Sequence, residues 1–199
     1  MKSSTINEIL ACLIMNKKPS ITKSTTIAKS RLFSIEKVNL LFSNGEQHEY
    51  ERIIAPGNGA VMIIPVINET TVIMIREYSV GTDRYELVFP KGLISAGESI
   101  EDAANREIME EIGFASKKLS HIDSMTIAPG YLSFTTHIVL AEDLYDKQLD
   151  GDEPEQLETV ECDLTKFDQI IKHPELTEAR SKAALYIVRD ILLAHPSHV

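Results

Sequence analysis

The spacing of hydrophobic and polar residues changes several times along the chain and predicts its elements. Apolar and polar residues alternate over Leu32–Leu40 and again over His48–Ile54, and Asn44-Gly45 between them is typical of a hairpin turn. We therefore expect an antiparallel strand pair in this region. The run Ala60–Ile67 is nearly all apolar, which predicts a strand buried on both faces.

Further short segments have the composition of strands and are separated by turn-forming residues. They are Thr71–Tyr78, Tyr85–Phe89, Ile122–Ile127, Phe134–Ala141 and Leu157–Asp163.

Helix signals occur at three places. The capping-box pattern Ser99 to Asp102 and the glycine Gly113 predict a helix over Ile100–Ile112. Near the end of the chain, Thr165 is the expected N-cap of a helix over Phe167–Lys172, and Thr177 that of a helix ending near Ala194. Strands with one central and two terminal helices predict an α+β fold, a mixed sheet with helices against it.

The first residues do not resemble the elements that follow. Ile9–Met15 is apolar but lacks the basic flank and cleavage site of a signal peptide, so we interpret it as part of a leader. An alternative is that Met15 is the natural start. Pro19–Lys29 is expected to be a linker or an edge strand. The expected organisation is a poorly ordered leader over 1–22, an N-terminal β segment over 23–56 and the main domain over 57–199.

Composition narrows the class of protein. The 199 residues hold 20 Lys and Arg against 30 Asp and Glu, a net charge of −10. This charge argues against a nucleic-acid groove or an anionic membrane as the main partner. No apolar run approaches the roughly 18 residues of a membrane span. Cys12 and Cys162 form no pair motif and are expected to be reduced thiols, which favours a cytoplasmic protein.

The helix predicted at Ile100–Ile112 carries acidic residues on its apolar side. At about 100° per residue, Glu111 falls within the apolar arc, Glu107 at its edge and Glu110 on its flank. Like charges at this spacing repel, and burying them without a counter-charge is costly. We therefore expect a cation beside them. It is either Mg²⁺ or Mn²⁺, which prefer oxygen ligands, or a basic residue such as Arg106.

The residues around this helix resemble the signature of the Nudix hydrolases. Gly92 is followed by Glu98 and then by the run Arg106–Phe114, at the spacing of that signature. The resemblance implies a Nudix-type α/β/α sandwich with a mixed sheet. It also implies metal-dependent hydrolysis of a nucleoside diphosphate linked to another group X, with Mg²⁺ as cofactor and Mn²⁺ as an alternative.

The same resemblance implies roles for individual residues. Glu107 and Glu111 would be metal ligands, and Glu110 a ligand or a water-bridged partner. The backbone carbonyl of Lys91 would be a further ligand. Residues that shape the site would be Gly92, Glu98, Arg106 and Gly113, with Arg106 pairing with Glu98 to hold the loop on the helix.

Other segments are similar to the ADP-ribose pyrophosphatase branch of this family, including bacterial members acting on ADP-linked compounds. They include Arg76–Thr82, Tyr85–Leu87 and Gly151–Glu155. This similarity implies AMP release from ADP-ribose and other ADP-sugars, NADH or diadenosine polyphosphates. Ser79 stands where relatives acting on ADP-ribose carry an arginine, which suits a broader range of ADP-X substrates.

The branch also suggests residues that contact the substrate. They are Arg76 and Arg52 for the diphosphate or the far moiety, Tyr50 for stacking on adenine, and Pro129 and Tyr131 in the segment after the helix. Each has a structural alternative. The arginines adjoin Glu77 and Glu51 and would also serve as surface ion-pair partners, while the tyrosines would also serve in packing and Pro129 in a turn.

The general base is expected in the acidic loop Gly151–Glu155, because the branch supplies it from a loop after the sheet. Glu155 is the first candidate and Glu153 the second, and Glu110 completes the catalytic carboxylates. The alternative is a solvated acidic loop without a catalytic role. The six histidines indicate no ligand set beyond the spacing of His195 and His198.

A second function stays open: a non-catalytic Nudix module that binds a nucleotide and regulates a partner. Isoprenoid-diphosphate isomerisation and nucleoside-triphosphate cleaning are further alternatives within the enzymes. The expected partner is a small ADP-X molecule, with no nucleic acid and no membrane. The family also implies a homodimer, with the N-terminal strands packing across a two-fold axis.

Overall fold

The structure is a computed structural model that describes residues 17–55, 57–151 and 153–193. The expected leader up to residue 16, the alternative start at Met15, Cys12 and the helix end near Ala194 lie outside these residues. The chain forms two compact units. Of the described residues, one unit contains 17–55 together with Ala128–Ser133, and the other contains Gly57–Ile127 and those from Phe134 to Leu193.

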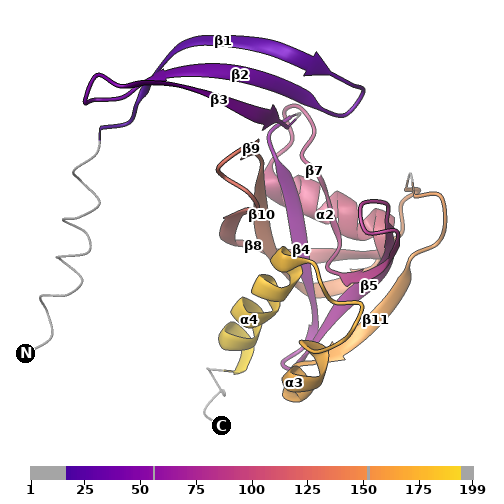
Figure 1. The fold of residues 1–199 in the computed structure, drawn as a ribbon. Coiled ribbons are helices and arrows are strands. Elements are labelled where there is room, and N and C mark those ends of the chain that lie inside the picture. The colour runs from indigo at the N-terminus through magenta and orange to yellow at the C-terminus, as the bar shows by residue number, and fades with distance from the viewer. Residues whose placement is uncertain (1–16, 56, 152, 194–199) are drawn as a thin grey trace, which may run out of the picture. The chain divides into compact units, whose positions relative to one another are not determined.

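The first unit is an antiparallel sheet extended by one short parallel strand. The expected pair forms as β2 (Ser34–Leu41) and β3 (Gln47–Ile54), in register from Ser34 opposite Ile54 to Leu41 opposite Gln47. β1 (Ser20–Lys29) pairs with β2 as an edge strand, so the expected strand pair is part of a larger sheet. This sheet begins at Ser20, before the expected start of the β segment at Lys23. β9 (Leu132–Ser133) pairs with β3 in parallel. Figure 1 shows β1, β2 and β3 side by side.

The second unit is built on a mixed sheet in the order β11-β5-β4-β10-β8, with β6 added to β5 and β7 to β4. β10 runs parallel to β4, and the other pairs are antiparallel. The strands are β4 (Ala60–Asn68), β5 (Thr71–Ser79), β6 (Arg84–Val88), β7 (Lys91–Leu93), β8 (Phe114–Thr126), β10 (Thr135–Asp146) and β11 (Glu158–Asp163).

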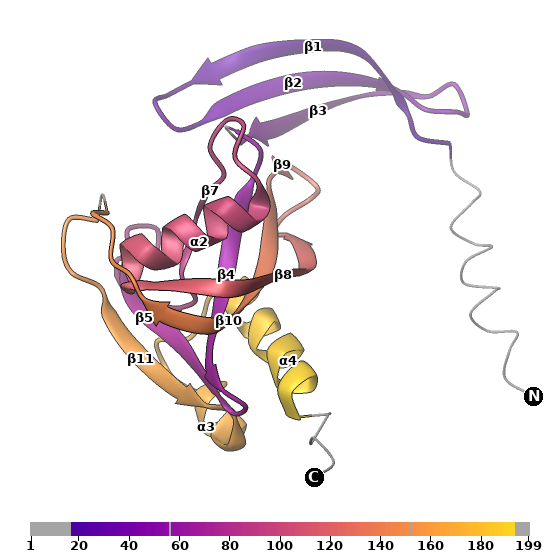
Figure 2. The same cartoon turned by 180° about the vertical axis from the view of Figure 1, so that it is seen from behind.

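Helices cover both faces of this sheet, which confirms the expected α/β/α sandwich (Figures 1 and 2). α2 (Ile100–Glu111) packs Ile108 on Val61 and Val139 of the sheet. On the other face, α3 (Phe167–Ile170) and α4 (Ala179–Leu193) contribute to a second apolar cluster. Strands β4 and β10 contribute to both clusters, and buried residues Val61 to Ile64 account for the apolar run in the sequence.

Several predicted element ends are wrong, and β10 continues to Asp146 instead of ending at the expected Ala141. β8 begins at Phe114, well before the expected Ile122, because the strand pairs with β10 from Phe114 onward, through the polar run at 116–118. Asp163, not Thr165, caps the terminal 3₁₀ turn η1 (Leu164–Lys166) that precedes α3. Thr177 donates to Glu86 instead of capping α4, and the carboxylate of Glu178 accepts from the Ser181 N–H in its place.

Cys162 is a buried free thiol, as expected. Burial raises the pKa of this thiol to about 11. Among the residues that the structure describes, no helix has the length and apolar character needed to cross a bilayer.

Candidate active site

The site is organised by helix α2, whose two ends are fixed by local sequence. Ser99 is the N-cap, and its side chain accepts a hydrogen bond from the Asp102 N–H at 3.0 Å. At the other end Ile112 is the C-cap and Gly113 has φ of +75°, a conformation that favours glycine. The helix therefore begins and ends where the capping signals predict, and its last two turns present Glu107, Glu110 and Glu111.

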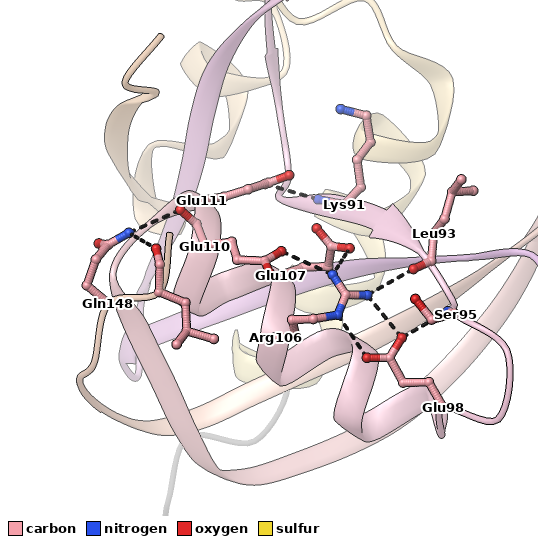
Figure 3. Close-up of polar contacts among 10 residues, drawn as sticks. Lys91, Leu93, Ser95, Glu98, Arg106, Glu107, Glu110, Glu111 and Gln148 are labelled. Carbon is pink, nitrogen blue, oxygen red and sulfur yellow. Dashed lines mark hydrogen bonds and ion pairs between the residues drawn. The ribbon is translucent and has the colours of Figure 1, made fainter. Parts of the chain in front are cut away.

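The carboxylate cluster consists of Glu98, Glu107, Glu110 and Glu111, and Arg106 lies among them (Figure 3). Its guanidinium donates to both carboxylate oxygens of Glu98, from Nε at 2.8 Å and from Nη2 at 3.0 Å. Nη1 donates to Glu107 at 2.6 Å and to Glu110 at 3.1 Å, and Nη2 also donates to the Leu93 carbonyl at 3.0 Å. The expected Arg106–Glu98 pair is present, and the same guanidinium also neutralises part of the acidic cluster.

Gly92 is the point of closest approach between strand β7 and the helix. A Cβ atom at this position would lie 1.9 Å from the carboxyl carbon of Glu107. Only glycine leaves this space to the carboxylate. Glu107 is 9% exposed, and its carboxylate lies between the backbone of Gly92 and the guanidinium of Arg106.

Glu111 lies in a different environment from its neighbours. Its carboxylate accepts a hydrogen bond from the backbone N–H of Lys91 at 3.3 Å (Figure 3). Burial raises the pKa of Glu111 to about 8, and nearby Glu107 and Glu77 act in the same direction. The ammonium group of Lys91, which is paired with Glu77, acts in the opposite direction. The raised pKa means that the ionised form of this carboxyl group is disfavoured, and a further cation beside it would stabilise that form.

The glutamates line a cavity of about 580 Å³ with a marked excess of acid. Its described lining residues include five acidic side chains, Glu107, Glu110, Glu111, Asp150 and Glu153, and two basic ones, Lys91 and Arg106. Carboxylate oxygens are the donors that Mg²⁺ and Mn²⁺ prefer, so the donor set and its unbalanced charge fit a divalent ion. Among the described residues, no three His, Cys, Asp or Glu side chains are yet grouped around one ion-sized point. In this arrangement one oxygen of Glu107 and one of Glu110 are hydrogen-bonded to Arg106.

The acidic loop between β10 and β11 is attached to the end of α2. The Lys147 N–H donates to the Gly113 carbonyl and the Leu149 N–H to the Met109 carbonyl, both at 3.0 Å. The side-chain amide of Gln148 donates to the carbonyl of Glu110 at 3.2 Å (Figure 3). These bonds place the start of the loop beside the helix turn that carries the glutamates.

Both loop glutamates lie in cavities shared with α2. Glu153 lines the 580 Å³ cavity and a second one of about 670 Å³. Glu155 lines the second cavity with Glu110 and Glu111, and its carboxylate accepts from the Tyr85 hydroxyl at 2.8 Å. The structure thus brings the candidate bases and the candidate metal ligands together.

Arg76 is not brought to the glutamates of α2. Its guanidinium donates to Glu175 at 2.9 and 2.7 Å and to Glu158 at 2.8 Å, rather than to the adjacent Glu77. It lines another cavity, of about 660 Å³, with Cys162. The described lining of that cavity contains none of the α2 glutamates, so in this state Arg76 is an ion-pair partner.

The remaining candidates gather in the first unit. Tyr50, Arg52, Pro129 and Tyr131 line one cavity of about 300 Å³ there. Arg52 pairs with Glu36 at 2.9 Å, not with adjacent Glu51. Tyr50 and Tyr131 are exposed rather than packed in a core.

Sequence reasoning gave no role to Glu77, Tyr85 or Gln148. For Glu77 the signal was present, because Ile73 and Ile75 on the same strand face point to the cluster under α2, and Glu77 continues that row. A charged residue in an otherwise apolar row is a candidate site residue. Tyr85 and Gln148 can be identified as site residues only from the folded structure, because their partners Glu155 and Glu110 are distant in the sequence.

The chain is similar to known proteins over most of its length. The family described as "NUDIX domain" matches residues 57–186, and "NudE-type Nudix hydrolase N-terminal domain" matches residues 19–52. The chain is 46% identical to "ADP compounds hydrolase NudE" of Escherichia coli (strain K12), over 88% of this chain and 94% of that protein. It is 30% identical to "ADP-ribose pyrophosphatase" of Bacillus subtilis (strain 168), over 80% of this chain and 89% of that protein.

A solved structure has the same fold. The crystal structure described as that of an ADP compounds hydrolase superposes with a TM-score of 0.83 at 46% identity. The match covers 90% of this chain and 97% of the other.

Proposed function

The chain belongs to the Nudix family of hydrolases, and we propose that it hydrolyses the diphosphate bond of ADP-linked compounds, releasing AMP. The observation that carries the proposal is the cavity in which Glu107, Glu110 and Glu111 meet the acidic loop. The names of the relatives, an ADP compounds hydrolase and an ADP-ribose pyrophosphatase, support the substrate class. ADP-ribose, other ADP-sugars, NADH and diadenosine polyphosphates are the proposed substrates.

The proposed cofactor is Mg²⁺, with Mn²⁺ as an alternative. Glu107, Glu111 and Glu110 would hold it, together with the backbone carbonyl of Lys91. The support is the acid excess of the cavity and the raised pKa of Glu111. When bound, the metal would neutralise charge on the phosphate oxygens and lower the pKa of a water molecule bound to it.

Glu155 is the proposed general base, and Glu153 is the second candidate. The carboxylate of Glu155 would take a proton from the water, whose oxygen bonds to one phosphorus. The bond from that phosphorus to the bridging oxygen breaks and its electron pair stays on that oxygen, so that the products are AMP and a phosphorylated partner. The Tyr85 hydroxyl supports this assignment because it fixes one oxygen of Glu155, leaving the other to accept a proton. Arg106 and Glu98 would keep the loop and helix together during the reaction.

Substrate recognition in the first unit stays a proposal from the sequence. Tyr50 would stack on adenine, and Arg52 would contact the phosphates or the far moiety. Supporting evidence is that both line one cavity with Pro129 and Tyr131. Arg76 would serve the diphosphate only after leaving Glu175 and Glu158.

We also propose a homodimer located in the cytoplasm. β1 is exposed along its whole length and carries Ile21 at 51% and Ile27 at 46% exposure. An exposed edge strand with apolar side chains favours pairing with another surface. The proposed partners are a small ADP-X molecule and a second copy of the chain, without nucleic acid or membrane.

Release of AMP from ADP-ribose, with and without Mg²⁺, tests the proposed function. We expect turnover that requires the metal and is reduced by orders of magnitude in Glu111→Gln. The matched control is Glu101→Gln, an exposed glutamate in the first turn of the same helix, which should retain activity. Binding of ADP-ribose without any turnover would contradict the proposal and favour a non-catalytic module.

The preferred X group follows from kcat/KM values for ADP-ribose, NADH and diadenosine tetraphosphate compared on one preparation. We expect a broad range, because Ser79 replaces the arginine of strict ADP-ribose enzymes. Activity confined to ADP-ribose would contradict the broad range.

A further inference from the structure

A cluster of two histidines and a serine lies in the second unit, outside the cavities lined by the glutamates. His121 and Ser124 belong to strand β8, and His137 belongs to the neighbouring strand β10. His137 lies directly opposite Ser124 in the antiparallel register. None of the three lines either glutamate cavity.

A β-bulge brings these side chains to one face of the sheet. Asp123 pairs with Ile138 and His121 with Val139, so Ile122 is an extra residue without a partner in β10. In a regular strand, residues three apart point to opposite faces. The extra residue restores His121 and Ser124 to the same face, an effect for which bulges are known near functional sites.

The packing of neighbouring residues confirms this arrangement. Ile122, Met125 and Ile138 contact the apolar cluster under α4. Because successive side chains alternate, His121, Ser124 and His137 point to the opposite face.

Two ring nitrogens converge on one point. Nε2 of His121 lies 3.0 Å from the Ser124 hydroxyl oxygen, and Nδ1 of His137 lies 2.9 Å from the same atom. The ring centroids are 5.2 Å apart and the planes are inclined by 65°. A hydroxyl carries one hydrogen, so it can donate to only one of the two nitrogens and must accept from the other ring. A cation, in contrast, can use a lone pair from both rings at once.

The charge state of the cluster suits metal binding. Burial lowers the pKa of His137, and His121 acts in the same direction. Neutral imidazole is the form that ligates metals. His121 and Ser124 are exposed and His137 is half-buried, so an ion can reach the cluster from solvent.

We propose that His121, His137 and the Ser124 hydroxyl form a binding site for a late first-row transition ion such as Zn²⁺, Ni²⁺ or Cu²⁺. Imidazole nitrogen suits these ions, whereas Mg²⁺ prefers oxygen ligands, so this site and the carboxylate cluster select different metals. The two ring nitrogens would bind at about 2.0–2.1 Å, with waters completing the coordination. This proposal does not depend on the proposed hydrolase function.

Calorimetric titration of Zn²⁺ into the untagged chain, with Mg²⁺ at saturation, tests the site. Mg²⁺ is added to compete with Zn²⁺ for the carboxylates of α2. The background variant His195→Asn/His198→Asn removes the histidine pair that the sequence places near the C-terminus. We expect one Zn²⁺ per chain in this background. His121→Asn should weaken binding at least about tenfold, since one of two nitrogen ligands is lost.

Controls separate this site from other histidines and from misfolding. His48→Asn alters an exposed histidine of β3 and should leave Zn²⁺ binding unchanged. His121 is exposed, so its variant should keep the melting temperature of the background. The electron paramagnetic resonance spectrum of bound Cu²⁺ should show nitrogen coupling that is reduced in His121→Asn and in His137→Asn. Absence of Zn²⁺ binding, or equal binding in the background and in both variants, would overturn the proposal.

Discussion

At the scale of single residues, the site depends on Gly92 as much as on its charged groups. The space that a Cβ would fill is taken by the carboxylate of Glu107. Since this carboxylate is the end of a flexible side chain, an added methyl group would displace it rather than unfold the protein.

Gly92→Ala should therefore impair function much more than stability. We expect kcat/KM for ADP-ribose to fall about 10²-fold, the scale of a roughly 1 Å misplacement of a catalytic group. The free energy of unfolding should change by less than about 1 kcal/mol. Gly81→Ala is the matched control, because a Cβ there meets nothing within 4 Å. Equal activity of the two variants would show that the position of Glu107 is unimportant.

The Glu98–Arg106 pair should make stability depend on pH. The hydrogen bond from Arg106 holds the pKa of Glu98 below its ordinary value of 4.5. A carboxyl whose pKa is lower in the folded state stabilises the fold above the unfolded-state pKa, and this contribution is lost as the pH falls through the folded-state pKa.

Urea unfolding of Glu98→Gln measures this contribution. Near neutral pH the variant should lose about 1–3 kcal/mol, because a charge-assisted bidentate pair with little exposure is broken. Below about pH 5 the difference from the unmodified chain should narrow. Glu101→Gln, on the exposed face of the same helix, should show neither effect. A difference that is constant with pH would contradict the assigned ionisation of Glu98.

At the scale of elements, the connection from β10 to β11 is held by hydrogen bonds both before the acidic loop Gly151–Glu155 and at its last residue. Bonds from Lys147, Gln148 and Leu149 attach its start to α2, and the Tyr85 hydroxyl holds Glu155. The loop therefore belongs structurally to the helix that carries the candidate metal ligands.

Glu155→Gln should lower kcat by orders of magnitude while leaving Mn²⁺ affinity unchanged, because the substitution removes the base but none of the proposed ligands. Glu153→Gln serves as the comparison, since this residue lies in the same loop and shares the cavity of about 670 Å³ with Glu155. Single-turnover measurements separate the chemical step from product release. A fully active Glu155→Gln would place the base elsewhere, with Glu153 tested by its own variant.

Elements with strong local signals were predictable from the sequence. Ser99 and Gly113 gave the ends of α2, and period-two alternation gave β2 and β3 within two residues. The first half of β8 was missed because the polar run at 116–118 interrupts its hydrophobic pattern, while pairing with β10 maintains the strand there. Thr177 was misassigned because its hydroxyl contacts Glu86, a residue distant in the sequence.

The candidate site shows the same limit. The inward carboxylates of α2 and the Arg106–Glu98 pair were predictable from spacing and from the signature. The bonds from Arg106 to Glu107 and Glu110 lie within one turn of α2, and Arg106 is one of the cations expected there from the sequence. The pairing of Arg76 with Glu158 and Glu175 depends on tertiary positions that no local pattern encodes.

At the scale of the whole molecule, the two units are not continuous in sequence. Ala128–Ser133 belongs with the N-terminal sheet because β9 pairs with β3. A division of the chain at a single boundary near residue 57 omits this excursion, which carries Pro129 and Tyr131.

The exposed edge of β1 leads to a prediction about assembly. Light scattering after gel filtration should give twice the chain mass of 22.2 kDa. Ile27→Lys, which places a charge on this edge, should shift the protein toward a single chain. Val80→Lys is the control, because Val80 is 85% exposed in a loop of the second unit. A single-chain mass for the unmodified protein would contradict the dimer.

The proposed hydrolase activity depends on a divalent ion bound by the acidic residues of α2. Titration of Mn²⁺ followed by electron paramagnetic resonance measures this binding without substrate. We expect the unmodified chain to bind Mn²⁺, Glu107→Gln and Glu111→Gln to bind it at least about tenfold more weakly, and Glu101→Gln to match the unmodified chain. Failure of the unmodified chain to bind Mn²⁺, or equal Mn²⁺ binding by all four proteins, would contradict a metal site formed by Glu107 and Glu111.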